Sequence, residues 1–249
     1  MSLAEFFREH PRVAIAVSGG TDSAFLLHEA LEYAERAEAF CVKTAFQPES
    51  ETEDALMIAR SEGAKLHLLL LDALVDENVR ANGPLRCYYC KRRIFGAIAD
   101  TAARCGLETV IDGTNASDSE SERPGMAALT ELGVLSPLRE CGLTKEEIRE
   151  LSREEGLPLW DKPSNSCLAT RQEPGKEITL KGLARTERAE RFVRSLGFSG
   201  FRVKTRGDSA YLRIMRRDLP LYEERFPEIE EGLKGLYECV CPEPEVRDE

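Results

Sequence analysis

Short apolar runs alternate with longer amphipathic stretches over the first two thirds of the chain. Four of these runs predict strands, at residues 13–17, 40–44, 66–71 and 109–112. Three stretches with apolar residues at helical spacing predict helices, at residues 22–36, 51–62 and 87–104. This alternation predicts an α/β fold, in which helices cover both sides of a parallel sheet. The run at residues 66–71 is apolar except for His67, so we expect this strand to be buried on both faces.

The last third of the chain has a different pattern, which predicts a smaller α+β domain. Before it, Thr144 and Glu147 have the spacing of a capping box, and residues 157–175 contain three prolines and predict a long loop. Residues 180–196 and 220–236 predict helices, and the alternating runs around residues 207–208 predict a β-hairpin. We therefore expect a first domain at residues 1–175, a second at 176–241, and a disordered acidic tail at 242–249.

The chain has 249 residues and a net charge of −11, yet its basic residues gather between Lys181 and Arg217. A basic region on an acidic protein favours a specific anion site over broad nucleic-acid binding; for any single arginine the alternative is a solvated helix face. No apolar run approaches the roughly 18–20 residues that span a bilayer, and residues 1–10 do not resemble a signal peptide. We therefore expect a cytoplasmic protein without a membrane segment.

A glycine-rich segment, SGGTDS at residues 18–23, stands between the first predicted strand and the first predicted helix. A turn at such a place brings backbone N–H groups and a helix N-terminus to one point, which makes an anion site. Its glycines permit a close backbone approach, and its hydroxyls add donors. No Lys-Ser or Lys-Thr follows the glycines, so this is not a Walker A loop. For Asp22 two interpretations stay open, a ligand of Mg²⁺ or a cap of the helix.

Three of the eight cysteines stand out by their surroundings. Cys87 and Cys90 are three residues apart at a predicted helix start, so both thiols lie on one face. The neighbouring Arg86 and Lys91 favour the thiolate form. Such a pair is a redox pair, half of a metal site, or a coincidence. Together with Cys167, the pair suits a [4Fe–4S] cluster with one open iron.

Two other cysteines have structural interpretations. Cys41 lies in a predicted apolar strand, where a thiol usually packs as core. Cys105 ends a predicted helix directly before Gly106, as expected at a helix C-terminus. We expect neither thiol to take part in chemistry.

Several segments resemble the LarE family of ATP-dependent sulfur transferases, which belongs to the PP-loop ATP pyrophosphatases. Residues 18–23 resemble the phosphate loop of that superfamily, and residues 113–115 (GTN) resemble its element at a strand end near nucleotide and metal. Residues 162–171 resemble the KPxxxCLAxR segment of the LarE family. Further matches lie at residues 86–91, 123–125 (Arg123, Pro124 and Gly125), 136–138, 201–204 and 207–208.

The resemblance implies a reaction and its ligands. Family members use ATP and Mg²⁺ to adenylylate a carboxylate of pyridinium-3,5-biscarboxylic acid mononucleotide, release pyrophosphate, and then replace AMP with sulfur. Many of them are homo-oligomers. The resemblance implies that ATP is bound by Ser18, Gly19, Gly20, Thr21, Asp22, Ser23, Thr44, Gly113 and Thr114.

Other residues are expected to bind the substrate phosphate and to supply the sulfur. Arg202, Lys204 and Arg206 alternate on one face of a predicted strand, so we expect the second domain to hold the substrate phosphate through them. In one family mode the cysteine that matches Cys167 attacks and gives up its own sulfur. In the other, Cys87, Cys90 and Cys167 hold a [4Fe–4S] cluster that carries the sulfide. Because this chain has all three cysteines, we favour the cluster mode.

Two other functions stay open as alternatives. A PP-loop tRNA thiolase shares adenylylation and cysteine-based sulfur delivery, but it should show a larger basic surface or an added RNA-binding module. A regulator that binds nucleotide without chemistry would not need the phosphate loop together with Cys167.

Overall fold

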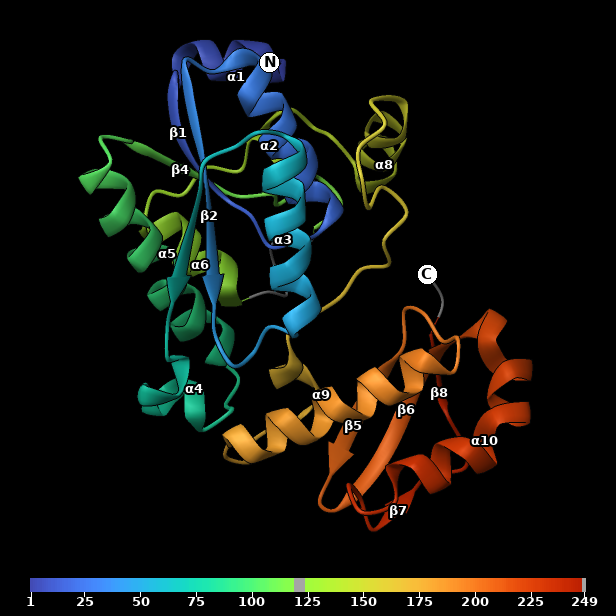
Figure 1. The fold of residues 1–249 in the computed structure, drawn as a ribbon. Helices are drawn as coiled ribbons and strands as arrows, with labels where there is room; N and C mark the ends of the chain where they lie inside the picture. Colours follow the sequence, from blue (N-terminus) through green and yellow to red (C-terminus); the bar gives the residue numbers. More distant parts are fainter. Residues whose placement is uncertain (119–123, 248–249) are drawn as a thin grey trace. The chain divides into compact units, whose positions relative to one another are not determined.

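The computed structural model describes residues 1–118 and 124–247 (Figure 1). The chain forms two compact units: Met1–Val79 with Leu85–Lys162, and Arg80–Pro84 with Pro163–Glu249. Arg123, which we expected to belong to a family motif, lies outside the described residues. Within the described part, no helix combines the length and the apolar composition needed to cross a bilayer.

A four-stranded parallel sheet forms the centre of the first unit, which confirms the predicted α/β fold. Its strand order is β3-β2-β1-β4, and all three strand pairs are parallel. The strands are β1 (Arg12–Ala16), β2 (Arg36–Lys43), β3 (Leu66–Leu70) and β4 (Thr109–Ile111). The central position of β1 places the segment that follows it between the ends of its neighbours, where ligands bind in open α/β sheets.

Helices cover both faces of this sheet (Figure 1). Val13 and Ile15 of β1 point into the core formed with α2, whereas Ala14 points into the core formed with Phe95 of α5. The longer helices are α1 (Leu3–Glu9), α2 (Thr21–Tyr33), α3 (Glu49–Ser61), α5 (Arg86–Arg104), α6 (Pro124–Glu131), and α8 (Lys145–Glu154). Short helical turns are η1 (Ala73–Val75), α4 (Glu77–Arg80) and α7 (Pro137–Glu140).

The strand at Leu66–Leu70 differs from the prediction. We expected it to be buried on both faces, but β3 lies at the edge of the sheet. Leu68 and Leu70 share one face, and 43% and 78% of their surfaces are exposed. An apolar run therefore did not indicate a central position, because the run alone does not show whether a strand has neighbours on both sides.

The two cysteines with structural interpretations lie where we expected them. Cys41 is buried in the core on the α2 side of the sheet, and burial raises the pKa of its thiol to about 11. Cys105 is the C-cap of α5, and Gly106 follows it with a φ of 73°. At a positive φ a glycine is the favoured residue.

The second unit packs two helices on a small mixed sheet. The hairpin of β5 (Arg202–Arg206) and β6 (Ser209–Met215) is antiparallel, while β7 (Cys239–Val240) and β8 (Glu245–Arg247) pair with β6 in parallel. Helices α9 (Leu180–Ser195) and α10 (Leu219–Leu233) contribute side chains to the same core as β5 and β6. We expected disorder from residue 242 onward, but β8 forms a strand there because β6 offers it a partner.

A buried ion pair joins three segments of the second unit. Arg171 ends the short turn η2 (Leu168–Arg171), and its side chain has no exposed surface. Its Nε donates to Oε1 of Glu190 on α9 at 2.8 Å. The same oxygen accepts from the backbone N–H of Val203 on β5 at 3.0 Å. One carboxylate thus fixes η2 and β5 to α9.

We predict that Glu190→Gln destabilises the second unit by about 3 kcal/mol, because it leaves the buried Arg171 guanidinium without a countercharge. Chemical denaturation measures this loss. Glu223→Gln is the matched control, since Glu223 is exposed on α10 and its substitution should change stability by less than about 0.5 kcal/mol. Equal stability of the two variants would contradict the role of the ion pair.

Candidate functional site

The glycine-rich loop between β1 and α2 is shaped by one backbone conformation. Gly19 is buried with a φ of 78°, and a Cβ there would clash with the backbone carbonyl of Glu51 on α3. Gly20 is the N-cap of α2 in an extended conformation, with a φ of −100°. The loop therefore turns tightly against α3 and leads into the first turn of α2. The N–H groups of that turn have no acceptor within the helix.

Two hydroxyl groups, of Ser23 and Thr21, form hydrogen bonds that stabilise this loop. Ser23 Oγ accepts from the backbone N–H of Ser18 at 3.2 Å and donates to the carbonyl of Gly20 at 3.1 Å. Thr21 donates to the carbonyl of Leu159 at 2.7 Å. Both hydroxyls bond to the backbone of the first unit, so they help to fix the conformation of the loop.

Asp22 carries an unsatisfied oxygen in the first turn of α2. Its Oδ1 is buried without a hydrogen-bond partner, and it does not cap the helix, since Gly20 is the N-cap and no side chain bonds there. Burial raises the pKa of Asp22, and the neighbouring Asp118 raises it further, against the opposing effects of Lys145 and Asn115. A bound cation would satisfy this oxygen, so Asp22 fits Mg²⁺.

The strand-end GTN element lies against the loop. A Cβ on Gly113 would lie 3.0 Å from the backbone nitrogen of Ser23, a tight contact that would require the neighbouring backbone to shift. Thr114 donates from its hydroxyl to Asp112 at 2.6 Å, and Ser136 donates to the other oxygen of Asp112 at 2.7 Å. The structure thus brings together the two segments that the sequence related to ATP.

Lys162 is a residue beside the loop to which sequence reasoning gave no role. Its Nζ donates to the carbonyl of Gly19 at 2.7 Å and pairs with Asp54 of α3 at 2.6 Å. Lys162 is part of the segment that resembles the LarE family, but its approach to a loop 143 residues away depends on tertiary structure. The Lys162 ammonium therefore lies against the loop backbone, with Asp54 as its countercharge.

Thr44 follows β2 as predicted, but its hydroxyl is engaged in a turn. It donates to Gln47 Oε1 at 2.7 Å and accepts from the backbone N–H of Phe46 at 3.0 Å. Thr44 therefore shapes the chain at this strand end through its own hydrogen bonds.

The three cysteines of the predicted sulfur centre belong to two units. Cys87 and Cys90 are half-buried in the first turns of α5, and Arg86 donates to Sγ of Cys87 at 3.3 Å. Cys167, also half-buried, is the N-cap of η2 in the second unit. Its carbonyl accepts from the backbone of Thr170 at 2.9 Å.

Arg171 holds the segment that carries Cys167. Its Nη1 donates to the carbonyls of Ser166 and Cys167 at 2.6 and 3.3 Å, and its Nη2 donates to Asn165 Oδ1 at 2.7 Å. The buried Glu190 fixes the Arg171 guanidinium. The hydrogen bonds from this guanidinium in turn fix the backbone at Cys167. Arg171 is a positioning residue that sequence reasoning did not assign.

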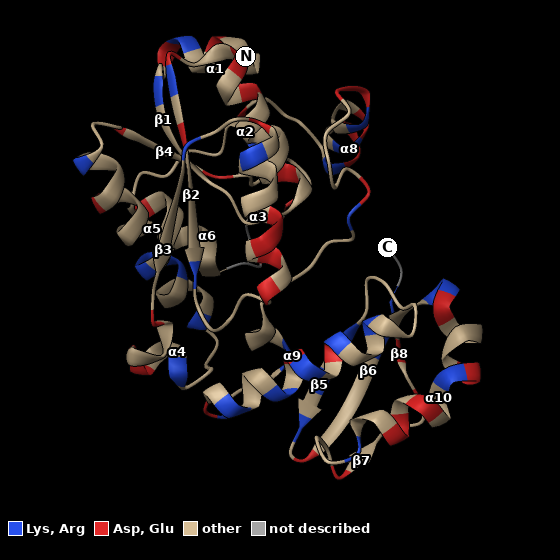
Figure 2. Ribbon diagram, in the orientation of Figure 1, with Lys and Arg blue, Asp and Glu red and all other residues tan. Residues whose placement is uncertain are grey.

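The three basic residues predicted on β5 differ in their partners. Lys and Arg positions recur along α9 and β5 (Figure 2). Lys204 and Arg206, however, pair with Glu245 of β8 at 2.9 and 2.8 Å. Arg202 is half-buried with an unpaired Nε, and burial lowers its pKa to about 10, with further lowering by Arg171 and other nearby arginines. Of the three, Arg202 is therefore the best placed to gain from an anion.

We predict opposite outcomes for alanine at the two loop glycines. Gly19→Ala meets a positive φ and the Glu51 carbonyl, so it should cost about 3 kcal/mol of stability and abolish ATP binding. Gly20→Ala keeps an allowed φ, and its Cβ would meet only Ser18 Oγ at 3.6 Å. Calorimetric unfolding and ATP titration compare the two, and a stable, ATP-binding Gly19→Ala variant would refute this geometry.

The chain is similar to known proteins over most of its length. The chain is 37% identical over 215 residues to an uncharacterised protein of Synechocystis sp., covering 86% of this chain and 80% of that protein. It is 32% identical over 215 residues to the pyridinium-3,5-bisthiocarboxylic acid mononucleotide synthase of Lactiplantibacillus plantarum, covering 86% of this chain and 78% of the synthase. The chain matches no protein-family model.

The fold is also found in a solved structure. The structure of NMN synthetase from Francisella tularensis aligns with a TM-score of 0.52 at 17% identity, over 66% of this chain and 72% of that one. At that identity the likeness concerns the fold alone. The sequence relationship to the synthase, together with the parallel sheet and its glycine-rich loop, shows that the chain is an enzyme of the LarE family within the PP-loop ATP pyrophosphatases.

Proposed function

We propose that this protein is an ATP-dependent sulfur transferase that converts a carboxylate of pyridinium-3,5-biscarboxylic acid mononucleotide into a thiocarboxylate. The observation that carries the proposal is the relationship to a synthase whose named product is a bisthiocarboxylic acid mononucleotide. A carboxylate is a poor electrophile, so exchange of its oxygen for sulfur requires activation. The loop and the cysteine segment supply groups for these two stages.

The first stage is adenylylation. A substrate carboxylate oxygen attacks the α-phosphorus of ATP, the bond to the β-phosphate breaks, and pyrophosphate leaves. The N–H groups at the start of α2 and the ammonium of Lys162 stabilise the leaving pyrophosphate. Asp22 would hold Mg²⁺, which supplies further neutralisation of phosphate charge when bound.

The second stage replaces AMP with sulfur, and two routes use Cys167. In the sacrificial route the Cys167 thiolate attacks the acyl carbon and AMP departs. The Cβ–S bond of Cys167 then breaks with loss of the Cα proton, which leaves a thiocarboxylate and a dehydroalanine. In the route that we favour, the thiolates of Cys87, Cys90 and Cys167 would hold a [4Fe–4S] cluster, which supplies a sulfide in place of the cysteine sulfur.

The second unit contributes position and charge. The bonds from Arg171 fix the backbone at Cys167, which lowers the entropic cost of presenting its sulfur. Arg202, with Lys204 and Arg206 beside it on β5, would bind the phosphate of the mononucleotide. Its buried, unpaired Nε supports this role.

We predict that anaerobically purified, iron- and sulfide-reconstituted protein is brown and keeps Cys167 intact over several turnovers. Mass spectrometry after addition of ATP and the biscarboxylic mononucleotide measures both the product and the protein. Loss of hydrogen sulfide from Cys167 in a colourless protein would establish the sacrificial route. Replacement of Cys87 and Cys90 by alanine separates the routes further, because only the cluster route requires these thiols.

We predict that Arg202→Gln raises the KM for the mononucleotide by about 10-fold, since a charge-assisted contact to phosphate is lost. Pyrophosphate release at saturating substrate should remain. Arg153→Gln is the control, because Arg153 lies on α8 of the first unit and 56% of its side chain is exposed. An equal effect of both substitutions would reject Arg202 as the phosphate contact.

The substrate class has its own test. Pyrophosphate release that depends on the mononucleotide supports the proposal. Tighter binding of tRNA than of the mononucleotide would instead favour a tRNA thiolase. ATP binding without pyrophosphate release with either substrate would favour a regulator.

A further inference from the structure

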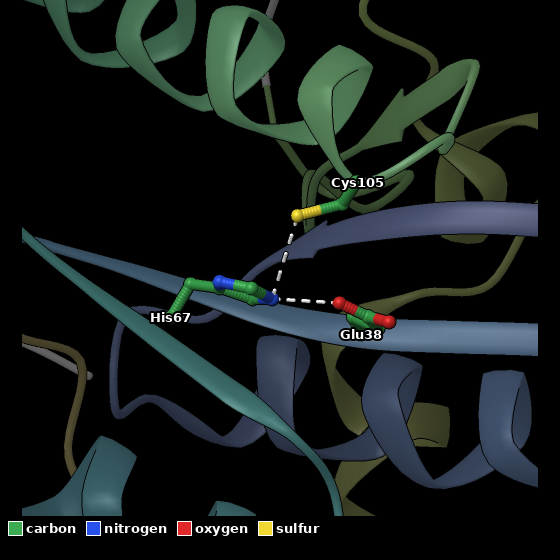
Figure 3. Close-up of side chains that lie close together, drawn as sticks. All are labelled: Glu38, His67 and Cys105. Carbon is green, nitrogen blue, oxygen red and sulfur yellow. Dashed lines mark hydrogen bonds and ion pairs between the residues drawn. The ribbon is translucent and has the colours of Figure 1, made fainter.

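A second set of metal-ligating side chains lies in the first unit, outside the site described above. Glu38 of β2, His67 of β3 and Cys105 at the end of α5 each place one ligand atom within 4.8 Å of the others (Figure 3). His67 Nε2 lies 2.6 Å from Glu38 Oε2 and 4.0 Å from Cys105 Sγ. The proposed ATP and sulfur chemistry uses none of the three.

The geometry excludes a proton relay. In a cysteine–histidine–carboxylate relay the thiol and the carboxylate bond to opposite nitrogens of the imidazole. Here both groups face the same Nε2 (Figure 3). Three donor atoms that converge on one point suit a cation.

The types of ligand atom and their spacing suit a metal ion of intermediate softness. Imidazole nitrogen, thiolate sulfur and carboxylate oxygen are the ligands of Zn²⁺, at roughly 2.0–2.3 Å. A tetrahedral shell with such bonds separates its ligand atoms by about 3.3–3.7 Å. The present separations of 2.6 and 4.0 Å lie on either side of that range. Shifts of less than about 1 Å would bring these two separations into that range. The third separation, between Glu38 and Cys105, is no longer than 4.8 Å.

The surroundings of Glu38 are compatible with a bound ion. Arg36 donates to Oε1 at 2.6 Å and so orients the carboxylate from the side away from His67. Burial opposes ionisation, but the hydrogen bonds from His67, Arg36 and Lys65 outweigh it and lower the pKa of Glu38 to about 2. The ring of Phe40 stacks on His67 with centroids 4.5 Å apart, which fixes the imidazole plane.

Lys65 is the group that competes with a metal. Its Nζ lies 3.1 Å from Glu38 Oε2, the oxygen that faces His67. The Lys65 side chain is 62% exposed, so it can turn into solvent at little cost. Its competition should weaken metal binding without preventing it.

We propose that Glu38, His67 and Cys105 form a site for a divalent transition-metal ion of the Zn²⁺ type, with solvent as the fourth ligand. The ion would join β2, β3 and the C-terminal end of α5. This proposal does not depend on the proposed function.

We predict that the full chain with Cys87, Cys90 and Cys167 replaced by alanine still binds one equivalent of Co²⁺. The substitutions remove the thiols of the proposed sulfur centre as competing ligands. Tetrahedral cobalt absorption with a thiolate charge-transfer band is expected, and Zn²⁺ should displace it and raise the melting temperature. Absence of the charge-transfer band would overturn the proposal.

Further substitutions in that background assign the ligands. Cys105→Ser should abolish the charge-transfer band, and His67→Ala should weaken Co²⁺ binding at least about 10-fold. Cys141→Ser is the matched control, because Cys141 is half-buried outside the cluster. Lys65→Met should tighten Co²⁺ binding, and this exposed change keeps the test valid where a ligand variant does not fold. A band that persists in Cys105→Ser, or unchanged affinity in Lys65→Met, would refute the site.

Discussion

Close backbone packing around the phosphate loop is the constraint on which the first unit depends. Gly19 packs against the backbone of α3, and Gly113 packs against the backbone at the start of α2. A Cβ at Gly19 is excluded and one at Gly113 would be tightly packed, so the loop, α2, α3 and the end of β4 are closely fitted to one another. A preformed anion site does not have to be ordered when a ligand binds, which reduces the entropic cost of binding.

In the second unit, hydrogen bonds from one side chain fix the segment around Cys167. Around Cys167 the chain has little regular structure, and a single guanidinium supplies the hydrogen bonds that a helix or sheet would otherwise provide. The cost of burying Arg171 is offset by Glu190, which lies on a long helix. A reactive side chain can thus lie on an irregular segment and still have a defined position.

Local sequence patterns predicted most of the longer helices and strands, but they did not predict contacts between segments that are distant in the sequence. The capping box at Thr144 begins α8 as expected, because capping involves residues only three apart. The short helix α1 was missed although Ser2 and Glu5 form the same motif. Lys204 and Arg206 were expected to be available for phosphate, but Glu245 lies beside them only because the chain end returns as β8. Lys162 likewise gains its place beside the loop from a contact between distant segments.

The edge position of β3 affects how copies of the protein meet in solution. An edge strand offers backbone hydrogen-bonding groups to any other strand, and Leu68 and Leu70 add an apolar face to this one. Only five residues long, the strand gives a short template. The net charge of −11 adds a repulsion between identical molecules, which is strongest at low ionic strength. Colloidal behaviour therefore depends on salt, which screens that repulsion while leaving the leucines unchanged.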